Sequence, residues 1–130
     1  KFVIVSGTSE KKSDVHVTDN IRKISYCTAN ELFELILRSD IIISRGGYST
    51  LMDLAHLHKK CVFVPTPGQT EQEYLVHELA KQNLVYTMDQ KHFDLNTAFI
   101  AVEKTKGFFI ETDPKEFLKT LEETLGEITD

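Results

Sequence analysis

Residues 40–53 read DIIISRGGYSTLMD, an unbroken apolar run followed at once by a glycine-rich turn. Apolar residues at every position from Ile41 to Ile43 are typical of a parallel strand that is covered on both faces. The residues after this run, 44–48, indicate a tight turn, and a helix is expected to begin near Ser49 or Thr50. A buried strand, a turn and a helix in this order predict one crossover unit of a parallel sheet.

The same alternation of strands and helices continues on both sides of this segment. We expect further strands at residues 2–5, 24–27, 61–64 and 84–86, and helices at 29–37, 70–82, 95–107 and 114–126. Thr28 and Glu31 form a capping-box pattern before the first helix, whereas residues 7–20 lack apolar periodicity and indicate a loop. The chain is therefore predicted to be a single α/β domain, residues 1–130, with a Rossmann-like parallel sheet and helices on both faces.

The composition is that of an ordinary folded domain and excludes several classes of partner. Of 130 residues, 41% are hydrophobic and 27% are charged, and the net charge of -5 would repel a phosphate backbone, so nucleic acid is not expected as a partner. The two cysteines cannot build a disulfide framework, and the five histidines lack metal-ligand spacing. No apolar run approaches the roughly 18 residues of a membrane span. We expect a cytoplasmic or membrane-peripheral protein that binds no metal ion.

The turn after the isoleucine strand is the first candidate binding site. Ligands of parallel α/β sheets bind beyond the carboxyl ends of the strands, and this turn offers main-chain N–H groups and hydroxyls to a pyrophosphate. Two glycines permit close approach of the backbone, and an arginine adds positive charge. The candidate residues are Ser44, Arg45, Gly46, Gly47, Tyr48, Ser49 and Thr50. A plain strand-to-helix turn that binds nothing is the alternative interpretation.

Asp53 follows Thr50 by three residues, and two interpretations remain open. Its carboxylate could cap the helix by accepting from the backbone of Thr50, or it could accept hydrogen bonds from the two hydroxyls of a ribose. The spacing by itself favours the cap.

The segment at residues 66–74 is the second candidate site, because it is rich in side chains that can bind hydroxyl groups. Gln69, Gln72 and Glu73 are its candidate residues, and the alternative is a capped helix start formed by Thr70 and Glu73. The two strand-end turns are expected to lie side by side in a parallel sheet, so that one ligand could contact both.

Residues 40–53, together with Val62–Pro65 and Gln72–Tyr74, resemble the C-terminal donor-binding domain of the MurG-type glycosyltransferases. The similarity covers roughly residues 20–90. These enzymes have the two-domain GT-B fold, so the resemblance implies a UDP-sugar as co-substrate, no metal or other cofactor, and an N-terminal domain that binds the acceptor. It also implies transfer of a hexosyl group with inversion at the anomeric carbon.

The resemblance assigns roles to individual positions. Asp53 stands where the family holds the ribose hydroxyls, and Gln72 and Glu73 stand where it has two sugar-binding amides, although Glu73 replaces a glutamine. The backbone at Thr28 and Ala29 matches the segment that pairs with uracil, and residues 44–50 match the turn near the diphosphate. No catalytic residue is identified.

The resemblance also implies that the first strand of this domain belongs before Phe2, so that the chain is a fragment of a longer protein. We therefore expect the fragment to bind UDP weakly, to lack transferase activity, and to self-associate through an exposed sheet edge. Two other functions remain open: a UDP-sugar 2-epimerase-like domain, and a non-catalytic nucleotide-sugar-binding half of a split transferase.

Overall fold

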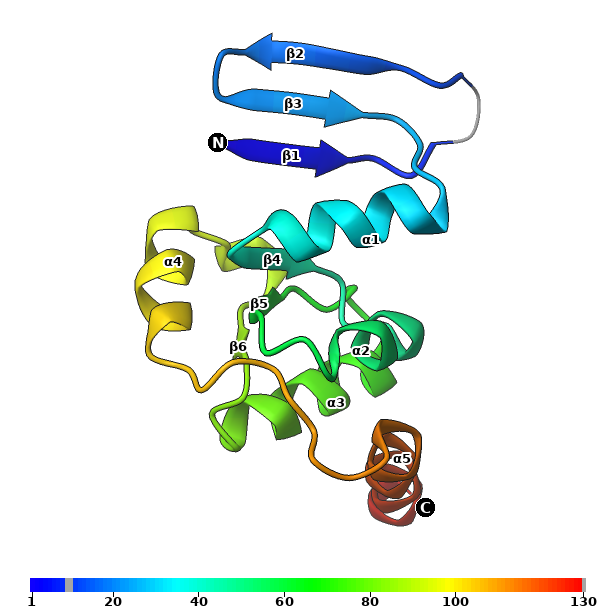
Figure 1. The fold of residues 1–130 in the computed structure, drawn as a ribbon. Coiled ribbons are helices and arrows are strands. Elements are labelled where there is room, and N and C mark those ends of the chain that lie inside the picture. Colours follow the sequence, from blue (N-terminus) through cyan, green and yellow to red (C-terminus); the bar gives the residue numbers. More distant parts are fainter. Residues whose placement is uncertain (9–10, 130) are drawn as a thin grey trace. The chain divides into compact units, whose positions relative to one another are not determined.

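The computed structural model describes residues 1–8 and 11–129 and divides into two compact units, Lys1–Ser39 and Asp40–Asp130 (Figure 1). Strands and helices alternate along most of the chain, and the predicted α/β class is confirmed. That residues 1–130 form a single domain stays a prediction.

The first unit is a small sheet followed by one helix. Its strands are β1 (Phe2–Val5), β2 (Asp14–Thr18) and β3 (Ile21–Ile24), in the order β1-β3-β2, and α1 (Ala29–Arg38) follows. Strand β1 pairs with β3 in parallel, whereas β2 and β3 form an antiparallel hairpin. All the strand residues of β1 and β2 are exposed.

Two sequence predictions in this unit are wrong. The loop predicted at residues 7–20 contains β2, whose Val15 and Val17 are 53% and 59% exposed. Ser9 and Glu10, which also fall in the predicted loop, lie outside the described residues. The strand predicted at 24–27 lies at 21–24 instead. After Ile24 the Ser25 backbone still donates to the Ser13 carbonyl at 2.9 Å and accepts from the Thr8 N–H at 2.8 Å, and the Ser25 hydroxyl donates to the Lys11 carbonyl at 2.7 Å.

The capping box predicted at the start of α1 is confirmed. The Glu31 N–H donates to the Thr28 hydroxyl at 3.2 Å, and the Thr28 N–H donates to the Glu31 carboxylate at 2.8 Å. The backbone N–H of Thr28, with a further contribution from Lys12, lowers the pKa of Glu31. Local side-chain chemistry therefore determines where this helix begins.

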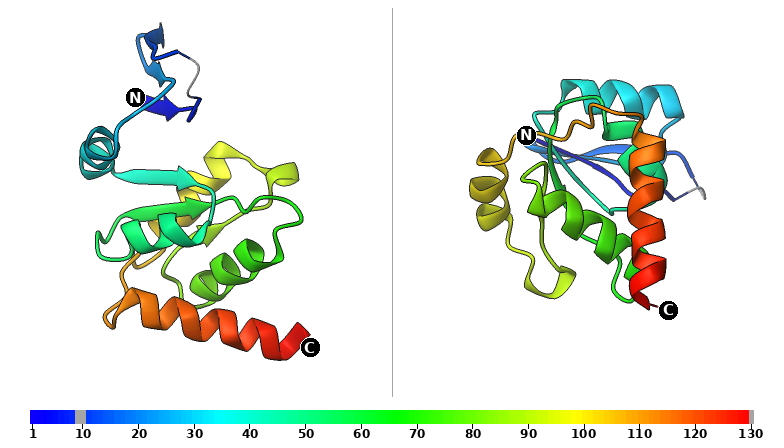
Figure 2. Two further views of the ribbon diagram at one scale, coloured as in Figure 1. Left: turned by 90° about the vertical axis from the view of Figure 1, so that its right-hand side faces the viewer. Right: turned by 90° about the horizontal axis from the view of Figure 1, so that it is seen from below.

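The second unit has a parallel sheet in the order β4-β5-β6. Its elements are β4 (Ile41–Ser44), α2 (Tyr48–Leu54), β5 (Lys60–Phe63), α3 (Thr70–Lys81), β6 (Tyr86–Thr87), the 3-10 helix η1 (Gln90–His92), α4 (Leu95–Glu103) and α5 (Pro114–Thr129). Helices α2 and α3 cover one face of this sheet and α4 covers the other (Figure 2). The predicted parallel sheet with helices on both faces is confirmed in this unit.

The core of the second unit follows the alternation of side chains along β5. Val62 is buried against Ala98 and Val102 of α4. Cys61 and Phe63 point to the opposite face, and the Phe63 ring meets that of Phe108 edge to face, with centroids 5.8 Å apart. Burial raises the pKa of the Cys61 thiol to about 12, so this thiol is neutral in the folded protein.

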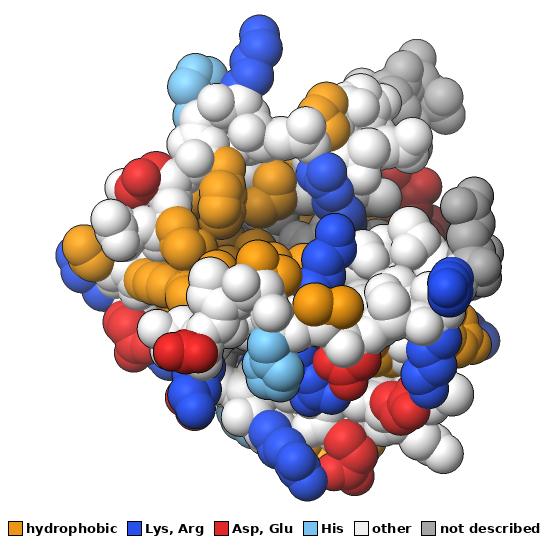
Figure 3. Space-filling model, turned by 90° about the horizontal axis from the view of Figure 1, so that it is seen from above, with side chains coloured by type: hydrophobic (Ala, Val, Ile, Leu, Met, Phe, Trp, Pro, Cys, Tyr) orange, Lys and Arg blue, Asp and Glu red, His pale blue; other side chains and the backbone are white. Residues whose placement is uncertain are grey.

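Element boundaries and burial differ from the predictions at several places. Ile43 is 41% exposed, so β4 is not covered on both faces along its whole length, and hydrophobic side chains also gather on the surface drawn in Figure 3. Helix α5 continues through Gly126, where its end was predicted, and ends at Thr129. Helix α4 ends at Glu103, before Gly107, and the edge strand is Tyr86–Thr87 instead of 84–86.

Among the described residues, no helix combines the length and the apolar character needed to cross a membrane.

Candidate functional site

The turns that follow β4 and β5 lie against each other at one edge of the second unit. A Cβ placed on Gly47 would be 3.8 Å from Nε2 of Gln72, and a Cβ placed on Gly46 would be only 2.1 Å from Cγ1 of Val76. The backbone after β4 therefore approaches the first two turns of α3 more closely than any larger residue would allow. The expected proximity of the two turns is confirmed, whereas ligand binding there stays a prediction.

Helix α2 begins earlier than predicted, which changes the interpretation of Asp53. Gly47 is the N-cap and Tyr48 the first helical residue, so Asp53 lies in the last turn of α2 and cannot form a capping box with Thr50. Asp53 is exposed, and residues three and four positions apart share a helix face, which places it beside Ser49 and Thr50. The cap interpretation is wrong, and an accessible carboxylate remains beside the glycine turn.

Gln72 and Glu73 both contact the loop between β5 and α3. The side-chain oxygen of Gln72 accepts from the Thr66 N–H at 3.0 Å, and that of Glu73 accepts from the Gly68 N–H at 3.3 Å. The predicted cap between Thr70 and Glu73 is therefore wrong, because Glu73 reaches back beyond the helix start. The amide nitrogen of Gln72 is the group that lies toward Gly47. Gln69 is the N-cap residue and is exposed.

Arg45 joins the ends of neighbouring strands. Its Nη1 donates to the carbonyls of Val64 at 3.2 Å and Pro65 at 3.4 Å, and its Nη2 donates to the side-chain oxygen of Gln90 at 2.7 Å. The sequence suggested only a positive charge near a diphosphate, but the guanidinium also holds three chain segments together. Gln90 had no signal in the sequence, since it is 45 residues away from Arg45.

The remaining predicted site residues occupy two places. Ser44 is half-buried at the end of β4, and its carbonyl accepts from the Val64 N–H at 2.9 Å; Tyr48 and Thr50 are half-buried and Ser49 is exposed. Thr28 and Ala29 belong to the first compact unit, where they are the exposed N-cap and first residue of α1. The structure therefore brings the glycine turn beside Gln72, whereas Asp53, Gln69, Thr28 and Ala29 stay predicted members of the site.

Comparison with known proteins agrees with this architecture. The model of the glycosyltransferase family 28 C-terminal domain matches residues 1–120. The UDP-N-acetylglucosamine–N-acetylmuramyl-(pentapeptide) pyrophosphoryl-undecaprenol N-acetylglucosamine transferases of Helicobacter pylori strains P12 and G27 are 30% identical to the chain over 77 residues. These matches cover 58% of the chain and 22% of each relative, so the chain matches only about a fifth of their length.

Similarity of fold extends to a solved structure. The NMR solution structure of ALG13 aligns with a TM-score of 0.53 at 16% identity, covering 85% of this chain and 58% of that one. The resemblance to a MurG-type C-terminal domain is confirmed. The chain belongs to the glycosyltransferase family 28 C-terminal domain family.

Proposed function

We propose that this chain is the donor-binding part of an inverting glycosyltransferase that uses a UDP-sugar without a metal ion. The observation that carries the proposal is the contact between the two turns: Gly47 lies beside the amide nitrogen of Gln72, at the edge where parallel sheets bind ligands. The exposed carboxylate of Asp53 lies one helical turn away from the residues that follow Gly47. Family membership supports a transferase over the epimerase alternative.

Each part of the donor then has a matching group in the chain. Main-chain N–H groups at Gly46 and Gly47 bind the diphosphate, and the missing side chain of Gly47 admits it close to the backbone. The carboxylate of Asp53 accepts from the two ribose hydroxyls. Gln69, Gln72 and Glu73 bind the sugar hydroxyls. Uracil pairing is left to the backbone of Ala29, because the Thr28 N–H already donates to Glu31 and the Thr28 carbonyl accepts from Leu32.

Transfer also needs an acceptor hydroxyl, a base that takes its proton, and dipoles that stabilise the departing diphosphate. Of these, the proposed site supplies only part of the last, through the N–H groups of the glycine turn. We therefore assign the acceptor to an N-terminal domain and expect the 130-residue chain to hydrolyse or transfer no sugar. Sustained turnover by this chain alone would contradict that assignment.

The test is titration of UDP, UDP-N-acetylglucosamine and UDP-galactose against the wild type and two variants by calorimetry. Asp53→Ala should weaken UDP binding by about tenfold to a hundredfold, because a charge-assisted hydrogen bond is worth roughly 1.5–3 kcal/mol. UDP-N-acetylglucosamine is the first sugar to test, since the relatives from Helicobacter pylori are named as N-acetylglucosamine transferases.

Glu103→Ala is the matched control, because it removes an exposed carboxylate from the end of α4, far along the chain from the glycine turn. Glu103→Ala should bind UDP as the wild type does. A chelator should leave the UDP affinity of the wild type and of both variants unchanged. If Asp53→Ala lowers the melting temperature while UDP affinity stays the same, the proposed ribose contact is refuted.

We further propose that the chain self-associates through β1. Its residues Phe2, Val3, Ile4 and Val5 are 37–49% exposed, and among the described residues β1 pairs with β3 alone. Light scattering should show species larger than a monomer, and Ile4→Lys should reduce them because a charge is costly to bury between paired strands. A clean monomer at high concentration would contradict this proposal.

A further inference from the structure

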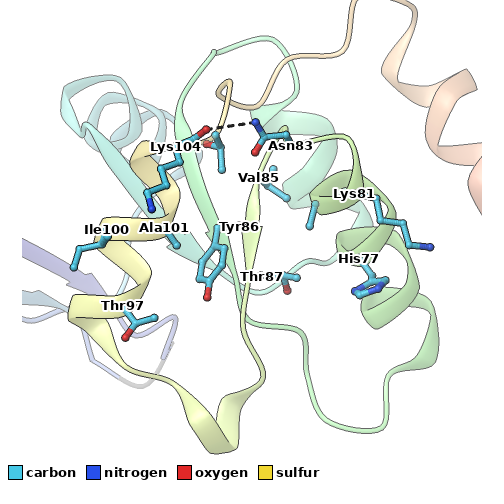
Figure 4. A pocket seen from close by; sticks show the side chains of 12 residues that line it. His77, Lys81, Asn83, Val85, Tyr86, Thr87, Thr97, Ile100, Ala101 and Lys104 are labelled. Carbon is cyan, nitrogen blue, oxygen red and sulfur yellow. Dashed lines mark hydrogen bonds between the residues drawn. The ribbon is translucent and has the colours of Figure 1, made fainter.

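The edge of the second sheet that β6 forms is the floor of a groove of about 600 Å³ between α3 and α4 (Figure 4). Its lining includes Val85, Tyr86 and Thr87 from the strand segment, Ala80 from α3, and Ile100 and Ala101 from α4. Ile100 is 66% exposed and contributes an apolar side chain to the wall of the groove. This groove contains none of the residues proposed to bind the donor.

Main-chain groups of β6 point into this groove. The Met88 N–H donates to the Phe63 carbonyl at 3.2 Å, and Thr87 is the residue opposite Phe63 in the parallel register. In a parallel ladder, one residue bonds to the two neighbours of its partner, so Tyr86 and Met88 direct their main-chain groups toward β5. Thr87, which lies between them, therefore directs its N–H and C=O groups to the opposite edge, where no described strand pairs with it, whereas Val85 is only 2% exposed.

The two walls of the groove carry positive charge. Lys81 comes from α3, and Lys104 is the C-cap residue of α4 on the other side. Lys81 also pairs with Glu78 at 2.6 Å. The main chain of Lys104 is engaged, since its N–H donates to the Ala101 carbonyl at 3.2 Å and its carbonyl accepts from the Asn83 side-chain amide at 3.4 Å, but among the described residues its ammonium makes no ion pair. Lysines beside an edge strand oppose pairing with a second copy of the same edge, because equivalent lysines would then approach one another. They favour a strand with acidic side chains.

We propose that the β6 edge binds an extended, acidic peptide segment of another protein, which adds a fourth strand to the sheet. The peptide backbone would pair with the outward N–H and C=O groups of Thr87. Apolar side chains at alternate positions would pack on Tyr86 and Ile100, and its carboxylates would meet Lys81 and Lys104.

The experiment titrates the 130-residue chain with an acetylated and amidated heptapeptide, Glu-Thr-Val-Thr-Val-Thr-Glu, monitored by amide chemical shifts in NMR. Shifts should concentrate at residues 84–88, and the same peptide with lysines at both ends should bind at least about tenfold more weakly. Methylation of the central peptide nitrogens should abolish binding, since it removes the donors of the added strand.

Two protein variants separate main-chain pairing from side-chain effects. Thr87→Pro removes the outward N–H, and proline is tolerated on an edge strand because that N–H makes no ladder bond. Thr87→Val is the matched control: it keeps the N–H and loses only the hydroxyl, which donates to the Phe63 carbonyl at 2.9 Å. Thr87→Pro should lose the peptide, whereas Thr87→Val should retain it.

Three results would overturn the proposal. Equal binding of the acidic and basic peptides would show that the lysines do not select the peptide. Undiminished binding of the methylated peptide would show that it does not pair as a strand. Self-association that Thr87→Pro abolishes would show that the occupant is a second copy of this chain. If Thr87→Pro unfolds the protein, as circular dichroism would reveal, the methylated peptide still decides the question.

Discussion

At the scale of single residues, the contact between Gly46 and Val76 determines how the turn after β4 lies on α3. Gly46 is buried, and any side chain there would overlap Cγ1 of Val76, since the two atoms would be 2.1 Å apart. The neighbouring Gly47 has ordinary van der Waals space around it. The two glycines therefore differ: the first is required by packing, and the second is open toward the proposed ligand.

We predict that Gly46→Ala destabilises the protein by about 1–3 kcal/mol, because an overpacked site forces neighbouring atoms to move. Adding Val76→Ala should recover part of this loss, so that the double variant is more stable than the sum of the two single changes predicts. Urea denaturation measures all three free energies. Gly126→Ala is the control, as its added Cβ meets no atom within 4 Å, and it should be neutral or stabilising. Strict additivity of Gly46→Ala and Val76→Ala would contradict this view of the contact.

At the scale of elements, the stability of α1 depends more on the capping box at its N-terminus than on packing against the core. None of its residues is buried, and Leu32, Phe33 and Leu37 are 40–46% exposed. Packing that stabilises most helices is therefore reduced here, and the capping box at Thr28 supplies a correspondingly larger share of the stability.

Thr28→Ala should destabilise α1 by about 1 kcal/mol, the usual cost of losing a threonine N-cap. Hydrogen exchange at the Leu32 amide, which donates to the Thr28 carbonyl at 2.9 Å, would report the local opening of this helix. Thr120→Ala is a matched change inside α5, where the threonine hydroxyl donates to the Glu116 carbonyl. It should leave stability equal or higher, since alanine is the better helix former. Equal effects of the two substitutions would refute the capping argument.

At the scale of the whole second unit, α5 packs on α3 with two carboxyl groups facing each other. Desolvation first, and then the neighbouring Glu71, raise the pKa of Glu122. A raised pKa means that folding favours the protonated form. Protonated Glu122 therefore contributes to the stability of the fold. This contribution is fully present below the ordinary glutamate pKa of 4.5 and is lost as the pH rises through the raised pKa of Glu122.

Glu122→Gln should accordingly be more stable than the wild type at pH 7, and the difference should vanish near pH 4, where Glu122 is protonated in both states. Thermal melting at several pH values measures this. Glu123→Gln is the control, because Glu123 is exposed and pairs with Lys119 at 3.7 Å, so its loss should not stabilise the protein at pH 7. A pH-independent effect of Glu122→Gln would contradict repulsion between the two carboxyl groups.

The periodic elements could be predicted because their signals are local. Helix α3 was expected at 70–82 and occupies Thr70–Lys81, and the capping box at Thr28 was correctly placed. Strand β2 was missed because Val15 and Val17 are its only apolar residues, and two alternating positions among polar neighbours are a weak strand signal. Part of the candidate site could also be predicted from the sequence. The order of the strands implied that the turns after β4 and β5 would be neighbours.

The amino-acid order alone determined the α/β class, the helix starts that side chains cap, and the edge of the sheet where a ligand is expected. Those properties depend on residues a few positions apart and on the parallel direction of the strands. Only the folded chain decided that Glu73 binds Gly68, that Arg45 reaches Gln90, and that β6 leaves main-chain groups unpaired by any described strand. Such contacts depend on how the backbone of one element meets another in space, which side-chain periodicity does not encode.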